Sequence, residues 1–433
     1  MEKTKVAIVG LGTVGTGVAR LLIDHGDRTA RHAGRTLWLE KAVVRDFDKP
    51  RGFTLPAGVM TKNLDDVLKN PEIKVVAQLI GGLEPARTIM LQLLEAGKDV
   101  VTANKALLAE HGPELFDRAR ALGRCIAFEA AVAGGIPIIT NVSQCFSANQ
   151  IQSLHGILNG TSNFIVSQMD LQGWSYAAAL KEAQRLGFAE ADPTMDVDGT
   201  DAAQKLAILA HLAFGARLRW NQIPRVGIDA LDATDLRFAR ELGYRIKLIA
   251  GARLTSAGLE LSVAPTLIRV GHPLAEVQAN YNAIRVVGDA VGDLFFHGQG
   301  AGQMPTASAV VADMIDTAVG RAPITFRTLE LWSDRAAPVA LRPDDDLPGR
   351  YYMRFTVTDQ PGVMAQLTAV LGEHQLSISS IIQHEPVTQQ PNAAVQLVIM
   401  THEAPEGAAR AAVEQIMQLP VVSGQSVRMR VMQ

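Results

Sequence analysis

The chain has 433 residues, enough for about three domains at roughly 150 residues each. Hydrophobic residues make up 48% and charged residues 20%, which excludes a disordered chain and is typical of a globular protein. The net charge is only −3, from 41 basic and 44 acidic residues, so the chain lacks the basic excess of a nucleic-acid-binding protein. Few aromatic residues (5%) beside 37 glycines favour an α/β architecture over an all-β sandwich.

Cysteine content and the N-terminal segment bear on the cellular compartment. Two cysteines, Cys125 and Cys145, cannot cross-link a chain of this length, and we expect both to be reduced thiols that pack as small core residues. Glycines interrupt the N-terminal apolar run, and no run reaches the roughly 18 apolar residues that a membrane span needs. We therefore expect a cytoplasmic protein.

The N-terminal region predicts a dinucleotide site. A short apolar strand over residues 5–9 is followed by a glycine-rich turn, and helical spacing covers residues 14–23. In this context the glycines allow a tight turn, close approach of a pyrophosphate to the backbone and close packing of helix on strand. The N–H groups at the start of the helix then face the phosphates. We expect the cofactor to contact Gly10, Gly12, Thr13, Val14 and Gly15.

The end of the second predicted strand, over residues 36–44, decides the type of dinucleotide. An acidic residue there binds the ribose 2′-hydroxyl of NAD, whereas an arginine accommodates the 2′-phosphate of NADP. The sequence has both, as Arg45 and Asp46. We favour NADP through Arg45, and NAD remains the alternative.

Further strand and helix patterns extend this first region. Strands are predicted over residues 75–80, 99–102 and 124–128, with a helix over 85–96. Ligands of open α/β sheets bind beyond the carboxyl ends of the strands, which is where Lys105 follows its strand. Position alone does not distinguish a functional Lys105 from a surface lysine.

A second region concentrates carboxylates between Glu190 and Asp201. A calcium loop is rejected because Lys205 would occupy the position that needs a bidentate Glu; a solvated acidic loop stays open on spacing alone. The helix predicted over residues 200–214 is nearly all apolar after Lys205, so we expect it to be buried. Asp201 and Lys205 share a face of this helix, and a lysine in such surroundings suits a general acid. We expect His211 to be a packed core residue.

The C-terminal third predicts a separate unit. Glycines over residues 298–302 precede a helix predicted over 306–319, and four prolines punctuate residues 321–349, which we interpret as a connector. Strand and helix patterns over residues 350–433 follow in the order βαββαβ, a ferredoxin-like unit without an evident nucleophile or metal cluster. This unit fits binding or regulation better than chemistry.

Several motifs, in one consistent order over residues 5–320, resemble homoserine dehydrogenase. They are Gly10-Leu-Gly-Thr-Val-Gly15, Thr102-Ala-Asn-Lys105, Glu129 with Ala133-Gly-Gly-Ile-Pro137, Asn159-Gly-Thr-Ser-Asn163, Gly187-Phe-Ala-Glu190-Ala-Asp-Pro193, Asp198-Gly-Thr-Asp201-Ala-Ala-Gln-Lys205-Leu and Gly300-Ala-Gly-Gln-Met-Pro-Thr-Ala-Ser. Residues 350–433, with Asp359-Gln-Pro-Gly-Val363, resemble an ACT domain. No kinase-like region precedes residue 5, so we expect the monofunctional form.

The resemblance implies an NAD(P)-dependent interconversion of L-homoserine and L-aspartate 4-semialdehyde, in threonine, methionine and isoleucine biosynthesis. It implies that Lys205 donates a proton to the carbonyl oxygen and that Lys105 lies near nicotinamide and substrate. It places Gly302 with the cofactor-binding residues and implies a substrate set of Gly187, Glu190, Asp196 and Asp201. It also implies a monovalent cation, which we expect to be sodium, held by Glu129 and main-chain oxygens of Val132, Gly134 and Ile136.

The implied organisation has four parts. Residues 1–135 form a Rossmann-type doubly wound domain, completed by 303–320, and residues 136–320 form an α+β catalytic and dimerisation domain. The connector spans 321–349, and the ACT domain spans 350–433. We expect a homodimer or homotetramer, with neither nucleic acid nor membrane as partner.

Regulation is expected at the first loop of the ACT domain. Asp359 and Gly362 flank a helix start whose N–H groups suit an amino acid's carboxylate, and L-threonine is the end product that the family implies. The proline-rich connector predicts that this domain can move relative to the enzyme. Two other functions stay open: another amino-acid NAD(P) dehydrogenase, and a non-catalytic amino-acid sensor, against which the intact Lys105, Glu190, Asp201 and Lys205 argue.

Overall fold

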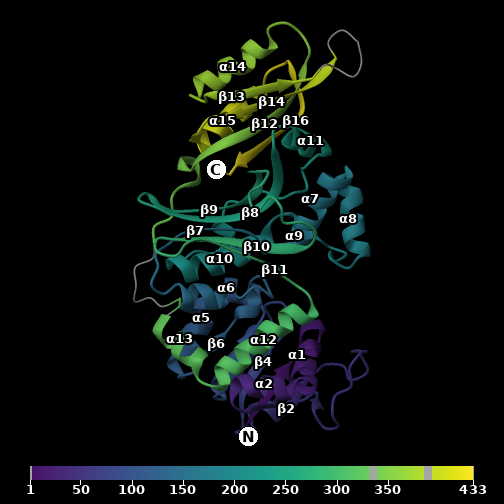
Figure 1. Ribbon diagram of the computed structural model, residues 1–433, viewed down its shortest axis with the longest axis vertical. Coiled ribbons are helices and arrows are strands. Elements are labelled where there is room, and N and C mark those ends of the chain that lie inside the picture. The colour runs from purple at the N-terminus through teal and green to yellow at the C-terminus, as the bar shows by residue number, and fades with distance from the viewer. Residues whose placement is uncertain (1, 330, 333–338, 385–392, 433) are drawn as a thin grey trace. The chain divides into compact units, whose positions relative to one another are not determined.

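Figure 1 shows the computed structural model, which describes residues 2–329, 331–332, 339–384 and 393–432. The chain separates into two compact units. Unit 1 contains Met1–Leu154, Ala203–Gln222 and Tyr281–Val339, and unit 2 contains His155–Ala202, Ile223–Asn280 and Ala340–Gln433. Among the described residues, every helix is too short or too polar to span a lipid bilayer.

Unit 1 is built on a six-stranded sheet in which every described pair of neighbours is parallel. The strands, in the order β3-β2-β1-β4-β5-β6, are Met60–Thr61, Thr36–Val43, Lys3–Val9, Ile73–Gln78, Asp99–Thr102 and Ile126–Ala127. This is the Rossmann order that the glycine-rich turn predicts, because β1 lies at the point where the chain reverses its direction across the sheet. The predicted α/β fold class is thereby confirmed.

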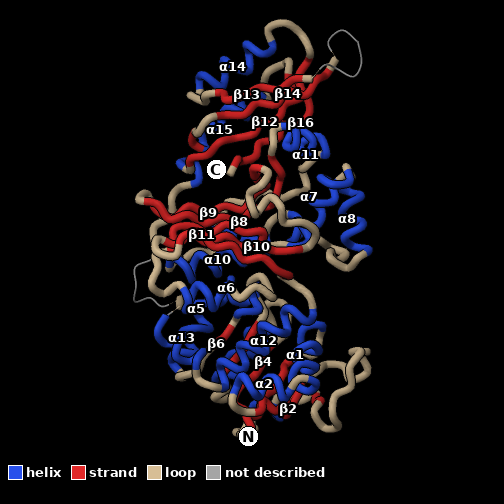
Figure 2. Tube along the Cα trace, in the orientation of Figure 1, coloured by secondary structure: helices blue, strands red, loops and turns tan. Residues whose placement is uncertain are grey.

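Helices cover this sheet, as the blue segments beside the red strands show (Figure 2). The helices of this part of unit 1 are α1 (Thr13–Asp24), α2 (Gly26–Ala33), α3 (Asp65–Leu68), α4 (Ala86–Glu95), α5 (Lys105–Ala121) and α12 (Gln303–Ala318). One core packs apolar residues of β1, β2 and β4 against α1 and α12, including Val18, Val310 and Met314. The distant helix α12 thus buries its apolar face in the same core as β1, β2, β4 and α1.

Of the predicted connector, residues 321–329 and 331–332 fold in unit 1, and residues 330 and 333–338 lie outside the described residues. Helix α13 (Arg321–Leu329) buries Phe326, whose ring stacks on Phe116 with centroids 5.3 Å apart. Trp332 lies 4.4 Å from the ring of Phe116 and stacks on His211 at 4.3 Å. The first part of the predicted connector therefore packs on α5 through the aromatic rings of Phe326 and Trp332.

The remaining elements of unit 1 include a β-hairpin and several short helices. The hairpin pairs β10 (Tyr281–Gly288) with β11 (Gly292–Gln299), and the short helices are η1 (Glu129–Ala131), α6 (Ile138–Thr140), η2 (Asn141–Cys145) and η3 (Trp220–Gln222). Cys125 is buried, as expected, but Cys145 is exposed at the end of η2. The prediction that Cys145 packs in the core was wrong, because only Val142 of that short helix is buried.

The first part of unit 2 combines helices with a long hairpin. Its elements are α7 (Gly160–Gln172), α8 (Tyr176–Arg185), α9 (Thr194–Val197), α11 (Ala233–Glu241), β8 (Tyr244–Thr255) and β9 (Gly258–Arg269). Strands β8 and β9 pair antiparallel along their whole length. Strand β7 (Ile151–Ile157) and helix α10 (Thr200–Phe214) each run from one unit into the other.

The second part of unit 2 is the βαββαβ domain that the sequence predicts. After η4 (Asp344–Asp346), its elements are β12 (Pro348–Thr358), α14 (Val363–Glu373), β13 (Ile378–Gln383), β14 (Ala394–Thr401), β15 (Ala404–Pro405), α15 (Glu406–Ile416) and β16 (Val422–Val431). Alternate residues of β12, among them Tyr351 and Phe355, pack under α14 and α15 (Figure 1). The predicted βαββαβ order is therefore confirmed.

This domain contacts the first part of unit 2 directly. Strand β16 pairs in parallel with β9 through Arg430 and Val431, so its sheet continues that of the first part of unit 2. On the face of β12 opposite the core, the Arg354 guanidinium donates two hydrogen bonds to the Asp235 carboxylate of α11, at 2.6 and 2.9 Å. These contacts bury Asp235 completely.

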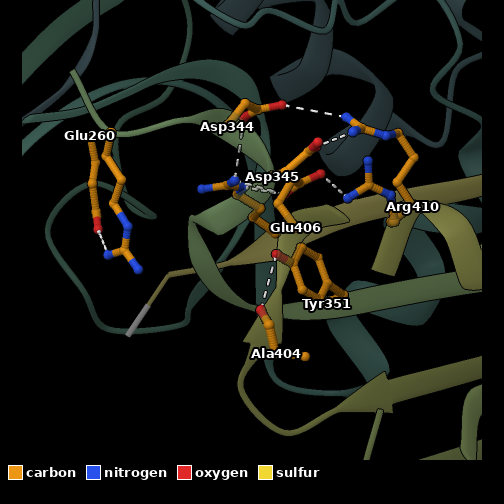
Figure 3. A network of polar contacts seen from close by, with 10 residues as sticks. Glu260, Asp344, Asp345, Tyr351, Ala404, Glu406 and Arg410 are labelled. Atoms are coloured by element: carbon orange, nitrogen blue, oxygen red, sulfur yellow. Dashed lines mark hydrogen bonds and ion pairs between the residues drawn. The ribbon is translucent and has the colours of Figure 1, made fainter. Parts of the chain in front are cut away.

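Ion pairs also hold the segment before β12 against the ACT domain (Figure 3). Glu406 begins α15, and its buried carboxylate accepts hydrogen bonds from Arg428 and Arg430. Burial alone would raise the pKa of Glu406, but the two guanidinium groups hold this pKa below its usual value. Arg410, one turn along α15, pairs with Asp345. Ion pairs as well as strand pairing therefore hold the start of the ACT domain in place.

Candidate active site

The glycine-rich turn has the geometry that a bound pyrophosphate requires. Gly10 has φ +103°, and a Cβ there would lie 2.9 Å from the carbonyl oxygen of Leu79. A Cβ on Gly15 would lie 2.0 Å from the Gly10 oxygen, so only glycine allows α1 to start this close to β1. Gly12 has open space around its Cα and lies immediately before α1, which begins at Thr13 and continues through Val14. These residues occupy the predicted places.

Gly302 and Arg45 lie beside this turn. Gly302 has φ +118° and precedes α12, whose first residue, Gln303, donates a hydrogen bond from Nε2 to the Thr13 oxygen at 3.0 Å. The Gly10 N–H donates to the Val43 oxygen at the end of β2, also at 3.0 Å. Arg45 is exposed two residues beyond Val43. Gly302 and Arg45 therefore both lie near the strand ends where a dinucleotide is expected.

Lys105 is the first residue of α5, three residues after β5 ends. The preceding Asn104 caps the helix by accepting a hydrogen bond from Leu107 N at 3.1 Å. Its amide group donates to the Ile80 and Gly82 oxygens, at 3.0 and 2.7 Å, beyond the end of β4. Lys105 thus starts a helix whose cap is tied to the neighbouring strand, at the carboxyl edge of the sheet.

Glu129 is a buried carboxylate at the start of α6. Its oxygens accept hydrogen bonds from Ile139 N and Thr140 N, both at 2.8 Å, and from the Thr140 hydroxyl. Its own N–H donates to the buried Asp313 carboxylate at 2.8 Å. Burial raises the pKa of Glu129, and burial together with the charge of Glu129 raises that of Asp313. Two adjacent buried carboxylates favour a compensating cation.

The main-chain positions expected beside Glu129 lie on one tight loop. Val132 follows η1, and Ala133 and Gly134 adopt positive φ values of 53° and 38°. A Cβ on Gly134 would lie 2.6 Å from the Gly300 oxygen, so a side chain has no room there. The Ile136 oxygen accepts a hydrogen bond from Ile138 N at 2.8 Å. Within the described residues, no three His, Cys, Asp or Glu side chains gather in a way that could hold a metal ion.

In the acidic region of unit 2, two carboxylates accept hydrogen bonds from the same side-chain amide. Asn159 Nδ2 donates hydrogen bonds to Asp196 Oδ1 at 2.7 Å and to Asp201 Oδ2 at 2.9 Å. Asn159 and Asp201 are 4% and 6% exposed, so this junction is buried. Two of the predicted substrate-binding acids are therefore held together, which a solvated acidic loop would not require.

Gly187 and Glu190 lie on the exposed loop after α8. Gly187 has φ +76° and ends the helix, as the sequence predicts. The hydroxyl of Thr161, in α7, donates to the Phe188 oxygen at 2.7 Å, and the Gln184 amide donates to the Glu190 oxygen at 3.2 Å. The loop backbone is thus held in place while the Glu190 side chain remains exposed.

Helix α10 contains both Asp201 and Lys205, one turn apart and therefore on the same face. Lys205 is half-buried, among otherwise buried residues of the helix. His211 is buried, and its ring receives a hydrogen bond from Trp332 N at 2.6 Å and contacts the Ala216 oxygen at 2.9 Å. Burial lowers the pKa of His211 to about 4, which agrees with the predicted neutral core histidine.

The predicted effector loop begins α14. Gly362 caps the helix with φ +91°, and exposed Asp359 accepts a hydrogen bond from the Gln383 amide at 3.1 Å. Sequence reasoning missed two residues: Asn159, which joins two of the predicted substrate acids, and Asp235, which anchors the ACT domain. An asparagine just before a predicted helix indicates that Asn159 caps this helix. No local signal indicates its contacts with two acids that lie 37 and 42 residues away.

Comparison with known proteins agrees with this arrangement. Residues 137–315 match the homoserine dehydrogenase family, residues 10–129 match the homoserine dehydrogenase NAD-binding domain, and residues 351–421 match the ACT domain. The chain is 44% identical to homoserine dehydrogenase of Pseudomonas aeruginosa, with 100% of both chains covered. It is 42% identical to that of Synechocystis, covering 96% of this chain and 97% of the relative.

Solved structures show the same likeness. A homoserine dehydrogenase from Thiobacillus denitrificans is 42% identical with a TM-score of 0.92, covering 100% of this chain and 99% of that one. A hyperthermophilic archaeal homoserine dehydrogenase in complex with NADPH is 26% identical with a TM-score of 0.61, covering 73% of this chain and 97% of that one. The chain therefore belongs to the homoserine dehydrogenases, oxidoreductases that act on a CH–OH group, and it carries a C-terminal ACT domain.

Proposed function

We propose that this enzyme interconverts L-homoserine and L-aspartate 4-semialdehyde with NADP(H), that Lys205 donates the proton, and that L-threonine inhibits it through the ACT domain. The observation that carries the catalytic proposal is the polar start of α10. There, a carboxylate held by a buried amide lies one turn before a lysine, on a helix that is mostly apolar. A charged residue on the protein surface would not need such a setting. Burying charged groups is costly, so their place here calls for a functional reason.

The chemistry assigns a role to each of these groups. Nicotinamide, when bound, supplies or accepts the hydride. Reduction of the aldehyde leaves negative charge on oxygen, which the Lys205 ammonium stabilises and then protonates. Carboxylates of Glu190, Asp196 and Asp201, with the Gly187 backbone, suit the ammonium and hydroxyl groups of homoserine. Lys105 is the second candidate for the proton donor.

NADP preference is tested by replacing Arg45 with alanine. A hydrogen-bonded guanidinium–phosphate pair is worth about 1.5–3 kcal/mol, so kcat/KM for NADP(H) should fall about 10- to 100-fold. The value for NAD(H) should change little, since NAD has no 2′-phosphate. Lys49→Ala, which removes another exposed cation from the same loop, is the matched control. Equal losses with both cofactors would show that Arg45 does not read the phosphate.

A monovalent cation, sodium by preference, is the second proposed cofactor. The buried carboxylates Glu129 and Asp313 support it, because their adjacent negative charges need compensation. The set proposed to hold it comprises Glu129 and the carbonyl oxygens of Val132, Gly134 and Ile136. Oxygen-only ligands suit a hard cation.

We also propose that the enzyme is a homodimer or homotetramer. The hairpin of β10 and β11 supports a second copy as partner, because it exposes two large apolar side chains, Phe295 at 38% and Tyr281 at 36%. Large apolar side chains grouped on a surface favour association.

L-threonine binding is tested in the full-length enzyme with Asp359→Ala. The N–H groups at the start of α14 suit the effector's carboxylate, and Asp359 suits its ammonium. We expect the threonine concentration for half-inhibition to rise at least about 10-fold, because losing a hydrogen bond to a charged group costs about 1.5–3 kcal/mol. Uninhibited kcat should not change. Gln360→Ala, at the exposed neighbouring residue, should leave inhibition intact; inhibition equally unaffected in Asp359→Ala would place the effector elsewhere.

A further inference from the structure

Asn159 connects three elements of unit 2 through one side chain. Its Oδ1 caps α7 by accepting a hydrogen bond from Ser162 N at 2.7 Å. Its Nδ2 carries two hydrogens, and one goes to Asp196, in α9, and the other to Asp201, in α10. Both N–H groups of the Asn159 amide therefore donate to carboxylates.

Helix α7 is anchored at several points, so its cap has a fixed position. In the middle of the helix, buried Lys247 of β8 donates to Asn163 Oδ1 at 3.1 Å and to Ser167 Oγ at 3.3 Å. Near the C-terminal end, Arg245 Nη1 donates to Asp170 Oδ2 at 2.6 Å. The residues that make these contacts with α7 belong to the long hairpin of unit 2. The loop before α9 contacts α7 through the hydrogen bond from the Thr161 hydroxyl to the Phe188 carbonyl oxygen.

A neutral donor between two carboxylates serves a purpose that neither capping nor packing requires. Asp196 and Asp201 carry like charges that repel each other when they approach. An amide that donates to both offsets this repulsion and sets the direction of each carboxylate, since hydrogen bonds to charged acceptors are strong and directional. Serine caps a helix as well as asparagine does but cannot make both bonds.

We infer that Asn159 is a positioning residue for the reaction: it holds the Asp196 and Asp201 carboxylates in the arrangement that binds the amino-acid substrate. This inference rests on the proposed function, in which these acids bind homoserine. Asn159 itself acts through the two carboxylates and needs no contact with the reacting atoms.

The test is Asn159→Ser in the full-length enzyme. Serine keeps the cap on Ser162 N but has one O–H donor in place of two N–H donors, so at least one of the acids loses its hydrogen bond. We expect KM for homoserine to rise about 10- to 100-fold, the effect of losing hydrogen bonds to charged groups. KM for the nicotinamide cofactor should stay near the wild-type value, because the glycine-rich turn belongs to other elements. Asn159→Asp, which caps but replaces the donors by a third carboxylate, should raise KM for homoserine further.

Two controls separate the possible failures. Ser175→Ala removes the cap of α8, where Ser175 Oγ accepts from Ala178 N, and should leave KM for homoserine unchanged. Asp201→Asn tests the proposed function directly. If Asp201→Asn raises KM for homoserine and Asn159→Ser does not, the positioning role is wrong while the proposed function stands. If neither raises it, the assignment of the acids to the substrate is wrong, and the positioning role is overturned with it.

Discussion

Replacement of Lys205 by alanine is expected to lower kcat about 10²- to 10⁴-fold, the usual contribution of a positioned general acid. The alkoxide formed from the aldehyde would then have neither a nearby positive charge nor a proton donor. The cofactor should still bind, because the glycine-rich turn and Arg45 belong to separate elements. Steady-state kinetics in both directions, with NADPH titration by fluorescence, measure the two effects separately.

Lys205→Arg distinguishes charge from proton transfer. Arginine keeps the positive charge, but its pKa above 12 makes it a poor acid at neutral pH. A partial recovery of kcat over the alanine variant is therefore expected, still well below wild type. Near wild-type turnover of Lys205→Ala would contradict the assignment. In that case Lys105→Ala, measured in parallel, should show the large loss instead.

Replacement of Asp235 by alanine is expected to destabilise the protein by about 3–5 kcal/mol, the cost of removing one partner of a buried ion pair. Arg354 is 8% exposed, and its guanidinium would keep only Gln396 among the partners described for it. Tyr352, whose hydroxyl donates to Asp235 at 2.9 Å, would lose its acceptor as well. Chemical denaturation followed by circular dichroism measures the change.

A double variant shows whether this loss comes from the pair. Asp235→Leu with Arg354→Met leaves neither charge buried, so it should be less destabilised than Asp235→Leu alone. The free energies of unfolding of both single variants and the double variant complete the cycle. Strict additivity of the single effects would mean that Asp235 and Arg354 do not stabilise each other.

Local signals in the sequence were enough for much of the fold and of the site. The turn at Gly10, the Rossmann strands and the βαββαβ order follow from periodicity and glycine placement, since each is fixed within about 20 residues of chain. Lys105 is found at the end of its strand, as expected. Assignment of Glu129 and its neighbours to a cation came only from the family resemblance, because main-chain oxygen ligands leave no pattern of residue types.

Other features depend on contacts between distant segments. Helix α5 was not predicted, because Gly112 and Pro113 interrupt its pattern; in the structure, Gly112 makes room for Trp332, to which a Cβ would approach within 2.9 Å. The parallel pairing of β16 with β9 involves only two residue pairs and has no local signature. The same is true of the contacts between Arg354 and Asp235, 119 residues apart.

The pairing of β16 with β9 matters for the engineering of strains that overproduce amino acids. Deletion of residues 350–433 would remove the proposed threonine site, but it would also turn β9 into an edge strand. It would expose backbone groups now used by the C-terminal strand, such as the Leu267 oxygen, which accepts from Met432 N at 2.9 Å. Bare edge strands promote aggregation. A feedback-resistant biocatalyst that stays folded at high expression should therefore keep its last strand and change single residues of the effector loop.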